Sequence, residues 1–324
     1  MKRVLVVHFS QTGQLRDIVD SVVAPLRSAA DIEVTAIELR PVTPFPFPWP
    51  FWYFFNTFPE CVYEEPEPIE NLSLAANAEF DLIILAYTVW FVSPNMPTMA
   101  FLQSDAAKRL LRDKPVITLI GCRNMWMMAQ ERVKEHLTKL GAHLIDNIAL
   151  VDLTDMWATF ISTPMWMLTG KRGPFLGGRV ARAGVPLEEI KRAQRFGAAI
   201  AKQLPQRRVD DASPMLTGLG AVTINESLLA SEPIVRRSFK VWGGLLRALG
   251  NRQSIGRRIV LGLYVLFLIT LILTVVPISA VIKALLKPLT RERVKRQRAY
   301  FAAPSGEAVV PAVPQHSVSS HVLD

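Results

Sequence analysis

The chain has 324 residues and a formal net charge of +9, with 50% hydrophobic and 20% charged residues. These proportions are typical of a folded protein that carries some membrane-directed sequence. The only cysteines, Cys61 and Cys122, are too few for a disulfide framework and lack metal-ligand spacing, so we predict reduced thiols and no metal site.

The positive charge is confined to two short blocks. Residues 236–258 contain seven Lys and Arg and no acidic residue, and residues 283–298 contain seven against Glu292 alone. The rest of the chain is therefore mildly acidic. Because the blocks lie on either side of an apolar segment, they predict membrane lipids with anionic headgroups as partners and argue against nucleic acid.

The first motif is an apolar run that ends in a small polar loop. Residues 4–7 (VLVV) predict a strand buried on both faces. A helix is expected to begin near Leu15, and helix N-termini bind anions through unpaired N–H groups. We predict a phosphate site here, the alternative being a loop whose hydroxyls only cap the helix. The loop consists of Ser10, Gln11, Thr12, Gly13 and Gln14.

Strands and helices alternate through the first half of the chain. Further strands are expected at residues 32–39, 82–87, 115–121 and 143–153, and helices at residues 15–29, 98–111 and 125–140. This order predicts a doubly wound α/β fold with a five-stranded parallel sheet. Ligands of such sheets bind beyond the carboxyl ends of the strands.

Two unusual loops follow strands of the predicted sheet. An aromatic loop with prolines follows the third strand and contains Val89, Trp90 and Phe91. The loop after the fourth strand begins with Gly121, Cys122, Arg123 and Asn124. Together with the S-x-T-G loop, this order resembles the flavodoxin-like FMN proteins and NAD(P)H-quinone reductases. The resemblance covers residues 1–155, with a closing helix near residues 186–204.

This resemblance implies an FMN site and a redox function. It places residues 10–14 around the FMN phosphate, residues 89–91 beside one side of the isoalloxazine ring, and residues 121–124 beside the other. Two positions depart from the family pattern, because Leu15 stands where a hydroxyl residue is common and Val92 where glycine is common. FMN is the implied cofactor, with NAD(P)H as a candidate electron donor.

Three blocks carry a narrower resemblance. MKRVLVVHFSQTGQL, PFPFPWPFW and GCRNMWMMAQERV are similar to bacterial proteins labelled dialkylresorcinol condensing enzymes, associated with aryl-lipid and aryl-polyene biosynthesis. This resemblance extends through about residue 205. A ketosynthase-type condensation needs a Cys nucleophile with His partners, and neither Cys61 nor Cys122 has a local activating motif.

Two insertions interrupt a flavodoxin-like domain that we place at residues 1–205. Residues 41–63 are rich in proline and aromatic residues, and residues 157–175 are rich in aromatic residues and methionine. Each is interpreted as a cover packed on its own sheet, or alternatively as a lid over the flavin edge or a lipid-facing lip. Residues 206–233 are interpreted as a linker.

The C-terminal part is predicted to form membrane-associated helices. Residues 234–288 combine a basic amphipathic helix, near residues 235–249, with an uncharged run at residues 259–282 that could span a bilayer. Basic flanks on both sides leave three topologies open: one crossing, a hairpin, or a shallow position in one leaflet. The positive-inside rule favours the latter two. Residues 289–324 are expected to be basic and then disordered.

The N-terminal run lacks a cleavage site and is interpreted as a strand and not a secretory signal. We therefore expect the domain at the cytoplasmic face of the bacterial inner membrane, anchored by residues 259–282. A homo-oligomer or a biosynthetic complex remains open.

The leading functional hypothesis is a membrane-attached FMN oxidoreductase that passes electrons to an apolar acceptor. The acceptor classes considered are a quinone and a lipid or aryl-polyketide intermediate, with FMN performing the redox chemistry. The alternatives are a non-catalytic membrane scaffold and a condensing enzyme. No catalytic acid or base is named, because His8, His136 and His143 lie in strand or helix patterns without an identifiable partner.

Overall fold

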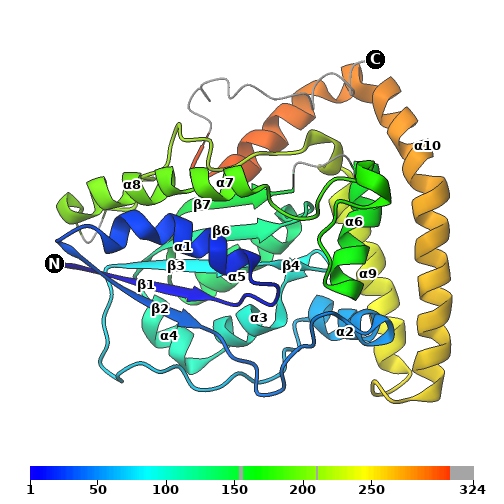
Figure 1. The fold of residues 1–324 in the computed structure, drawn as a ribbon, viewed down its shortest axis with the longest axis horizontal. Coiled ribbons are helices and arrows are strands. Elements are labelled where there is room, and N and C mark those ends of the chain that lie inside the picture. The colour runs from blue at the N-terminus through cyan, green and yellow to red at the C-terminus, as the bar shows by residue number, and fades with distance from the viewer. Residues whose placement is uncertain (153–155, 209–210, 307–324) are drawn as a thin grey trace.

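The computed structural model describes residues 1–152, 156–208 and 211–306. At its centre is a five-stranded parallel sheet with the strand order β2-β1-β3-β6-β7 (Figure 1). Its strands are β1 (Lys2–His8), β2 (Ile32–Glu38), β3 (Leu82–Tyr87), β6 (Pro115–Cys122) and β7 (His143–Val151). A short antiparallel pair, β4 (Val89–Trp90) and β5 (Ser93–Pro94), follows β3. The strand order is that of flavodoxin-like sheets, so the predicted fold class is confirmed.

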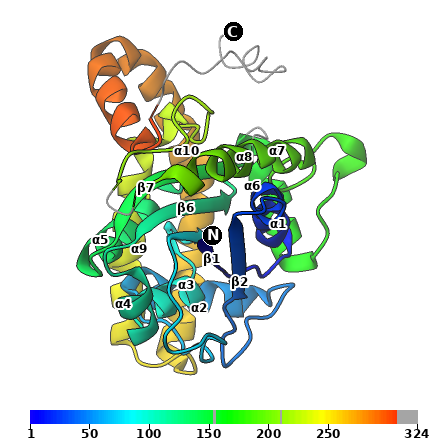
Figure 2. The same cartoon turned by 90° about the vertical axis from the view of Figure 1, so that its left-hand side faces the viewer.

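Helices cover both faces of the sheet. One face carries α1 (Gln14–Arg27), α7 (Leu187–Arg192) and α8 (Gln194–Gln203), and the other carries α3 (Met96–Leu102), α4 (Asp105–Leu111) and α5 (Met127–Lys139) (Figure 2). This division follows from right-handed crossovers that run in opposite directions along the sheet, from β1 to β2 on one side and from β3 to β6 and β7 on the other. The order of strands reverses between β1 and β3, which places the expected ligand edge at their carboxyl ends.

The central strands form the core because their sequences are continuously apolar. Residues 4–7, 82–87 and 116–120 are all buried. Val6 pairs with Ile84, and Ile84 pairs with Ile117, so three neighbouring strands present apolar side chains in register. Strands covered by helices on both faces require this composition.

One predicted helix is two helices in the structure. The apolar periodicity of residues 98–111 continues through both, but α3 ends at Leu102 and α4 begins at Asp105. Ser104 causes the break, because its side-chain oxygen accepts a hydrogen bond from the Ala107 N–H and caps α4.

The two insertions form helices that lie at the carboxyl side of the sheet. They are α2 (Phe51–Tyr63) and α6 (Met156–Thr169), and the Trp49 N–H before α2 donates to the Met167 carbonyl oxygen in α6 at 2.8 Å. Residues 215–222, within the predicted linker, pack along β7. There the Met215 N–H donates to Asp146 at 2.7 Å and the Ala149 N–H donates to the Ala221 carbonyl oxygen at 2.8 Å.

The C-terminal helices are α9 (Ser231–Ala248) and α10 (Ile255–Ala302). Their positions include the two helical segments predicted from the sequence, but α10 continues 20 residues beyond residue 282. Within the described residues, Ile255–Ser279 is the one helix segment long and apolar enough to cross a membrane. Residues 307–324 of the predicted tail lie outside the described residues. Short 3-10 turns occur at Leu176–Gly178, Leu204–Gln206 and Glu226–Leu228.

Candidate functional site

The loop between β1 and α1 presents a row of backbone donors. The N–H groups of residues 11–15 have no acceptor among the described residues, whereas the Arg16 N–H donates to Ser10 Oγ at 3.1 Å. Gly13 has φ +84°, a conformation that disfavours a side chain, and the space beside it is open. Consecutive unpaired N–H groups before a 14-residue helix are an arrangement that binds a phosphate.

Two side chains of this loop are already engaged by the protein. The Gln11 amide donates to the Pro46 carbonyl oxygen at 2.9 Å and accepts from Trp49 Nε1 at 3.0 Å. The Gln14 amide donates to the Val185 carbonyl oxygen and accepts from the Val185 N–H. The phosphate predicted at residues 10–14 would therefore contact the backbone and the half-buried Thr12, and not these two amides.

Leu15 and a cation from a distant segment complete the surroundings of the loop. Leu15 is buried, and a Cβ at Gly121 would lie 3.0 Å from its Cδ1, so its side chain packs beneath the end of β6. A Cβ at Gly184 would lie 2.7 Å from Gln14 Nε2 and 2.9 Å from Arg172 Nη2, which places the Arg172 guanidinium beside the start of α1.

Arg172 is suited to an anion because its positive charge is incompletely offset. Burial and the nearby Arg182 lower the pKa of Arg172, against the opposing effects of Asp17 and Asp152. Its Nε donates to the Ala183 carbonyl oxygen at 3.2 Å, and its guanidinium lies 4.7 Å from the ring centroid of Trp166. Sequence reasoning missed Arg172, which is about 160 residues from the loop and belongs to no recognisable motif.

The aromatic loop after β3 is divided between two neighbourhoods. Trp90 is buried and packs edge-on against Phe9, Phe45 and Trp49, with ring centroids 5.1–5.9 Å apart. Phe91 instead packs between α2 and α9, in contact with Phe54, Phe58 and Phe239. Val89 is half-buried. The role of these three residues beside a flavin ring stays a prediction.

The segment from Phe45 to Trp49 covers Trp90. Trp49 is 2% exposed, and its indole N–H donates to the side-chain oxygen of Gln11, in the loop between β1 and α1. Because Trp90 is buried by its contacts with this segment, a planar ring could stack on it only if the segment moved aside. The first insertion is thus in part a cover over its own sheet, and it also closes the position that the resemblance gives to the isoalloxazine ring.

The loop after β6 is half-buried beneath α6. Residues 122–124 are neither fully buried nor exposed, and Gly121 is buried. Arg123 Nη2 donates to Thr159 Oγ1 at 2.7 Å, and its guanidinium lies 4.7 Å from the Phe160 ring centroid. Burial lowers the pKa of Arg123, with Asp152 opposing. The second insertion therefore covers this loop as the first covers Trp90.

Neither cysteine has the surroundings of a nucleophile. Burial raises the pKa of both the Cys61 and the Cys122 thiols, with nearby carboxylates acting in the same direction. Cys61 Sγ is 3.5 Å from the Trp90 carbonyl oxygen and 3.6 Å from that of Pro94. A reactive thiol needs a lowered pKa, so neither thiol has the surroundings of a nucleophile.

A buried carboxyl group lies against the start of α5, which follows the loop after β6. Glu232, in the first turn of α9, is fully buried, and its Oε1 accepts from the Met128 N–H at 2.7 Å while Oε2 has no partner among the described residues. Burial raises the pKa of Glu232 to about 8 despite the N–H donors of Met128 and Met127 and the charge of Arg236. Sequence analysis did not single out this residue.

The arrangement fits one half of FMN directly. The unpaired N–H groups of residues 11–15, the open space at Gly13 and the Arg172 guanidinium suit a phosphate monoester. The isoalloxazine ring of FMN fits beside Trp90 only after the segment from Phe45 to Trp49 moves away. Among the described residues, no group of three or more His, Cys, Asp and Glu side chains could hold a metal ion.

No protein-family model matches the chain, and no curated protein matches it. Among solved structures, it is similar to a flavoprotein from Lactobacillus acidophilus NCFM in complex with FMN, with 17% identity and a TM-score of 0.37 over 45% of this chain and 92% of that chain. A WrbA-like flavodoxin from Agrobacterium tumefaciens has 14% identity and a TM-score of 0.35 over 64% and 100% of the two chains. Flavodoxin 1 from Bacillus cereus has 14% identity and a TM-score of 0.33 over 62% and 98%. The comparisons give no support to the condensing-enzyme resemblance, and likenesses at this level leave the function to be argued from the site.

Proposed function

We propose that the chain is a membrane-attached FMN-binding oxidoreductase that passes electrons to an apolar acceptor. The observation that carries this proposal is the row of five unpaired N–H groups at residues 11–15, in the loop after β1 and the first turn of α1, at the strand-order reversal of a flavodoxin-like sheet. Bound FMN would supply the electron-transfer chemistry. The proposed donor is NAD(P)H, and the proposed acceptors are a quinone or a lipid or aryl-polyketide intermediate.

Each part of the site has a separate role in this proposal. Residues 11–15 bind the phosphate through the backbone, and Arg172 balances its charge. The Phe45 to Trp49 segment opens to admit the ring and then excludes water from it. Arg123, buried under α6, places a positive charge beside the loop after β6, where negative charge on a reduced flavin would be stabilised.

A non-catalytic scaffold and a condensing enzyme are the two alternative functions. A non-catalytic scaffold is favoured by the closed Phe45 to Trp49 segment, because the rings of Phe45 and Trp49 pack against Trp90. Carbon–carbon condensation is disfavoured, since both thiols have raised pKa values and neither makes a hydrogen bond with a His among the described residues. A scaffold would be purified colourless and would not bind added FMN.

The phosphate loop can be tested by Thr12→Glu with Thr12→Gln as its matched control. Thr12 is half-buried and makes no side-chain hydrogen bond among the described residues, so both variants should fold. A carboxylate here would repel the FMN phosphate and weaken binding roughly a hundredfold, by the strength of charge-assisted hydrogen bonds. The neutral amide of the Thr12→Gln variant should leave most of the affinity.

The measurement is a fluorescence titration of detergent-purified protein with FMN and with riboflavin, which lacks the phosphate. The unsubstituted protein should bind FMN more tightly than riboflavin. Thr12→Glu should abolish this difference by weakening FMN binding, without altering riboflavin binding. Equal FMN affinity in all three proteins would refute the assignment of the loop. A chain that binds neither flavin would support the scaffold.

A further inference from the structure

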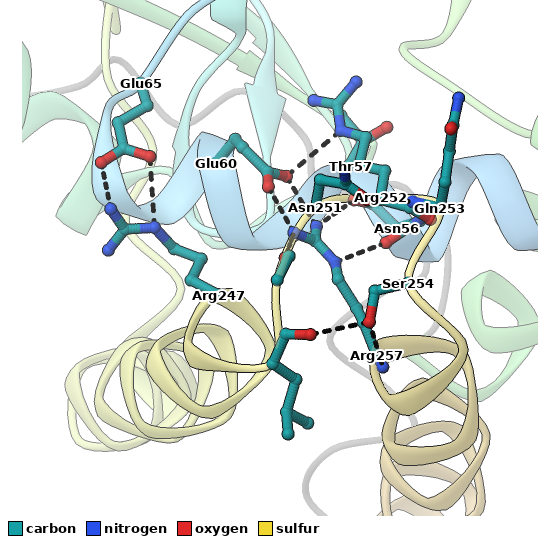
Figure 3. A network of polar contacts seen from close by, with 12 residues as sticks. Asn56, Thr57, Glu60, Glu65, Arg247, Asn251, Arg252, Gln253, Ser254 and Arg257 are labelled. Atoms are coloured by element: carbon teal, nitrogen blue, oxygen red, sulfur yellow. Dashed lines mark hydrogen bonds and ion pairs between the residues drawn. The ribbon is translucent and has the colours of Figure 1, made fainter.

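The first end of α10 is fastened to the domain by a buried arginine. Arg257 is 1% exposed, and its guanidinium bonds both carboxylate oxygens of Glu60, at 2.7 and 2.9 Å, together with Asn56 Oδ1 at 2.8 Å (Figure 3). Arg252 adds a bond to Glu67 at 2.5 Å. The turn between α9 and α10 is thereby held on α2.

The second end of α10 is fastened to the same domain. After the helix ends at Ala302, the buried Ser305 Oγ accepts from the Asn147 N–H at 2.7 Å and lies 3.1 Å from Asp146 Oδ1. Phe301 is 8% exposed and belongs to the main core. The seat of this end is therefore β7, the edge strand of the central sheet.

Between the two fastened ends, α10 exposes a long apolar surface. Ile255–Ser279 spans about 37 Å at the helical rise per residue, more than the ~30 Å hydrocarbon core of a bilayer. Six large side chains of this segment and of the residues just beyond it are exposed by 55–83%, whereas Leu261 and Tyr264 face the domain and are buried. The six exposed side chains are those of Ile259, Leu263, Leu266, Leu273, Leu285 and Leu289. Such a surface on a water-exposed helix needs an apolar partner.

The contacts at the two ends of α10 restrict how this helix can be placed in a bilayer. A helix that crossed the membrane would leave its far end about 30 Å away on the other side. Ser305 could not then reach Asp146, which lies in the same domain as Glu60. Residues 255–302 are also one helix without a connecting loop, so no helical hairpin enters the bilayer.

We propose that α10 lies in one leaflet of an anionic membrane and does not cross it, so that the chain is monotopic. This inference rests on the membrane attachment in the proposed function. The exposed apolar side chains enter the acyl region, and both ends of the helix stay on the side of the domain. An interfacial helix of this kind combines apolar burial with attraction to anionic headgroups.

The charges are distributed as this position requires. Of the first basic block, Arg252 and Arg257 both pair with Glu60 of α2, and Arg252 also pairs with Glu67. Arg247 pairs with Glu65. Arg258 is exposed at the start of the apolar stretch. At the other end the exposed cations are Arg291, Arg293, Lys295 and Arg296. Both ends of the apolar surface thus present cations to headgroups of one leaflet.

This position also orients the candidate site. Figure 1 shows the strands of the sheet pointing toward α6, α9 and α10, so the carboxyl edge of the sheet faces the helix that we place in the leaflet. An apolar acceptor dissolved in that leaflet would approach the domain from its cofactor edge. With α10 in the leaflet, the carboxyl edge of the sheet is accessible to lipid-soluble substrates from that leaflet and is less accessible to substrates from the aqueous phase.

The topology is tested with the full chain carrying an epitope tag at each terminus. Inside-out membrane vesicles from expressing cells and intact spheroplasts are treated with protease. Both tags should be digested in the vesicles and both protected in the spheroplasts. A C-terminal tag digested in spheroplasts, with the N-terminal tag protected, would overturn the monotopic position while leaving membrane attachment intact.

Depth along the helix gives an independent measurement. Nitroxide labels are attached to Ile259→Cys, Leu266→Cys, Leu273→Cys and Leu285→Cys, with the unsubstituted chain as the labelling blank, and depth is measured by power saturation. All four labels should lie within one leaflet. A depth profile that passes through the bilayer centre to the opposite headgroups would overturn the proposal.

Vesicle binding separates this proposal from its rivals. The purified chain should cosediment with phosphatidylglycerol-containing vesicles more than with phosphatidylcholine vesicles, and salt should weaken the difference. Failure to bind either vesicle would overturn both the monotopic position and membrane attachment. A detergent-free dimer that buries the α10 labels would assign the surface to a second copy of the chain. None of these outcomes depends on flavin binding.

Discussion

Arg257→Met is expected to release α9 and α10 from α2. The Arg257 guanidinium is almost fully buried, and the substitution removes its bonds to Glu60 and to Asn56 together (Figure 3). Burial alone would raise the pKa of Glu60, but Arg257 and Arg252 hold it below its ordinary value, so this carboxylate is charged. Removing one partner of a buried pair costs about 3–5 kcal/mol.

The measurement is hydrogen exchange in detergent micelles, followed separately over α2, α9 and the sheet. Exchange from α2 and α9 should become roughly a hundredfold faster or more, because local opening responds directly to the lost free energy. Exchange from β1, β3 and β6 should change little, since these strands are buried away from the network. Uniformly faster exchange throughout the domain would mean that α10 is part of the main folding unit.

Arg258→Met is the matched control. It removes the same charge one residue later in α10, but Arg258 is exposed and makes no ion pair among the described residues. Its exchange rates should match those of the original chain. If both variants open α2 to the same degree, the effect comes from net charge and the buried network is not the fastening.

The sheet and the polar loop after β1 could be predicted from the sequence because their signals are local, whereas phosphate binding by that loop stays a prediction. The VLVV run demands burial on both faces, and a polar loop with Gly13 before a helix predicts unpaired N–H groups. The structure places these groups where the sequence indicated. The end of α10 was harder to predict, because Lys and Arg are good helix formers that end a hydrophobic run without ending a helix.

The remaining features could not be predicted because they join distant parts of the chain. Arg172 meets the phosphate loop through Gly184, and Ser305 reaches Asp146 across 159 residues. Trp90 follows the third strand as expected, but its partners are fixed by tertiary packing that no local pattern encodes. A resemblance indicates which loops meet at the sheet edge, whereas the packing of residues 45–49 on Trp90 decides whether that edge is open.

Glu232→Gln is expected to stabilise the protein at neutral pH. The raised pKa of about 8 means that the folded state keeps the Glu232 proton while the unfolded chain loses it near pH 4.5. Between these two values the unfolded state binds fewer protons, so the stability of the original chain falls as pH rises. The substituted amide would be neutral in both states and would keep an oxygen to accept the Met128 N–H. The expected gain is about 3 kcal/mol at pH 7, from 1.36 kcal/mol per pKa unit over the 2.5 pH units above the unfolded value.

The test is guanidinium unfolding of the full chain in detergent at several pH values. The difference between Glu232→Gln and the original chain should be small near pH 4.5, grow by roughly 1 kcal/mol per pH unit, and level off above pH 8. Glu226→Gln is the control, because Glu226 lies one turn before α9 but is exposed and pairs with Arg298 at the surface. A pH-independent difference, or the same slope in the control, would show that Glu232 does not carry a raised pKa. A confirmed slope would mean that α9 is joined to the start of α5 by a neutral acid, and that alkaline pH weakens this contact between the two helices.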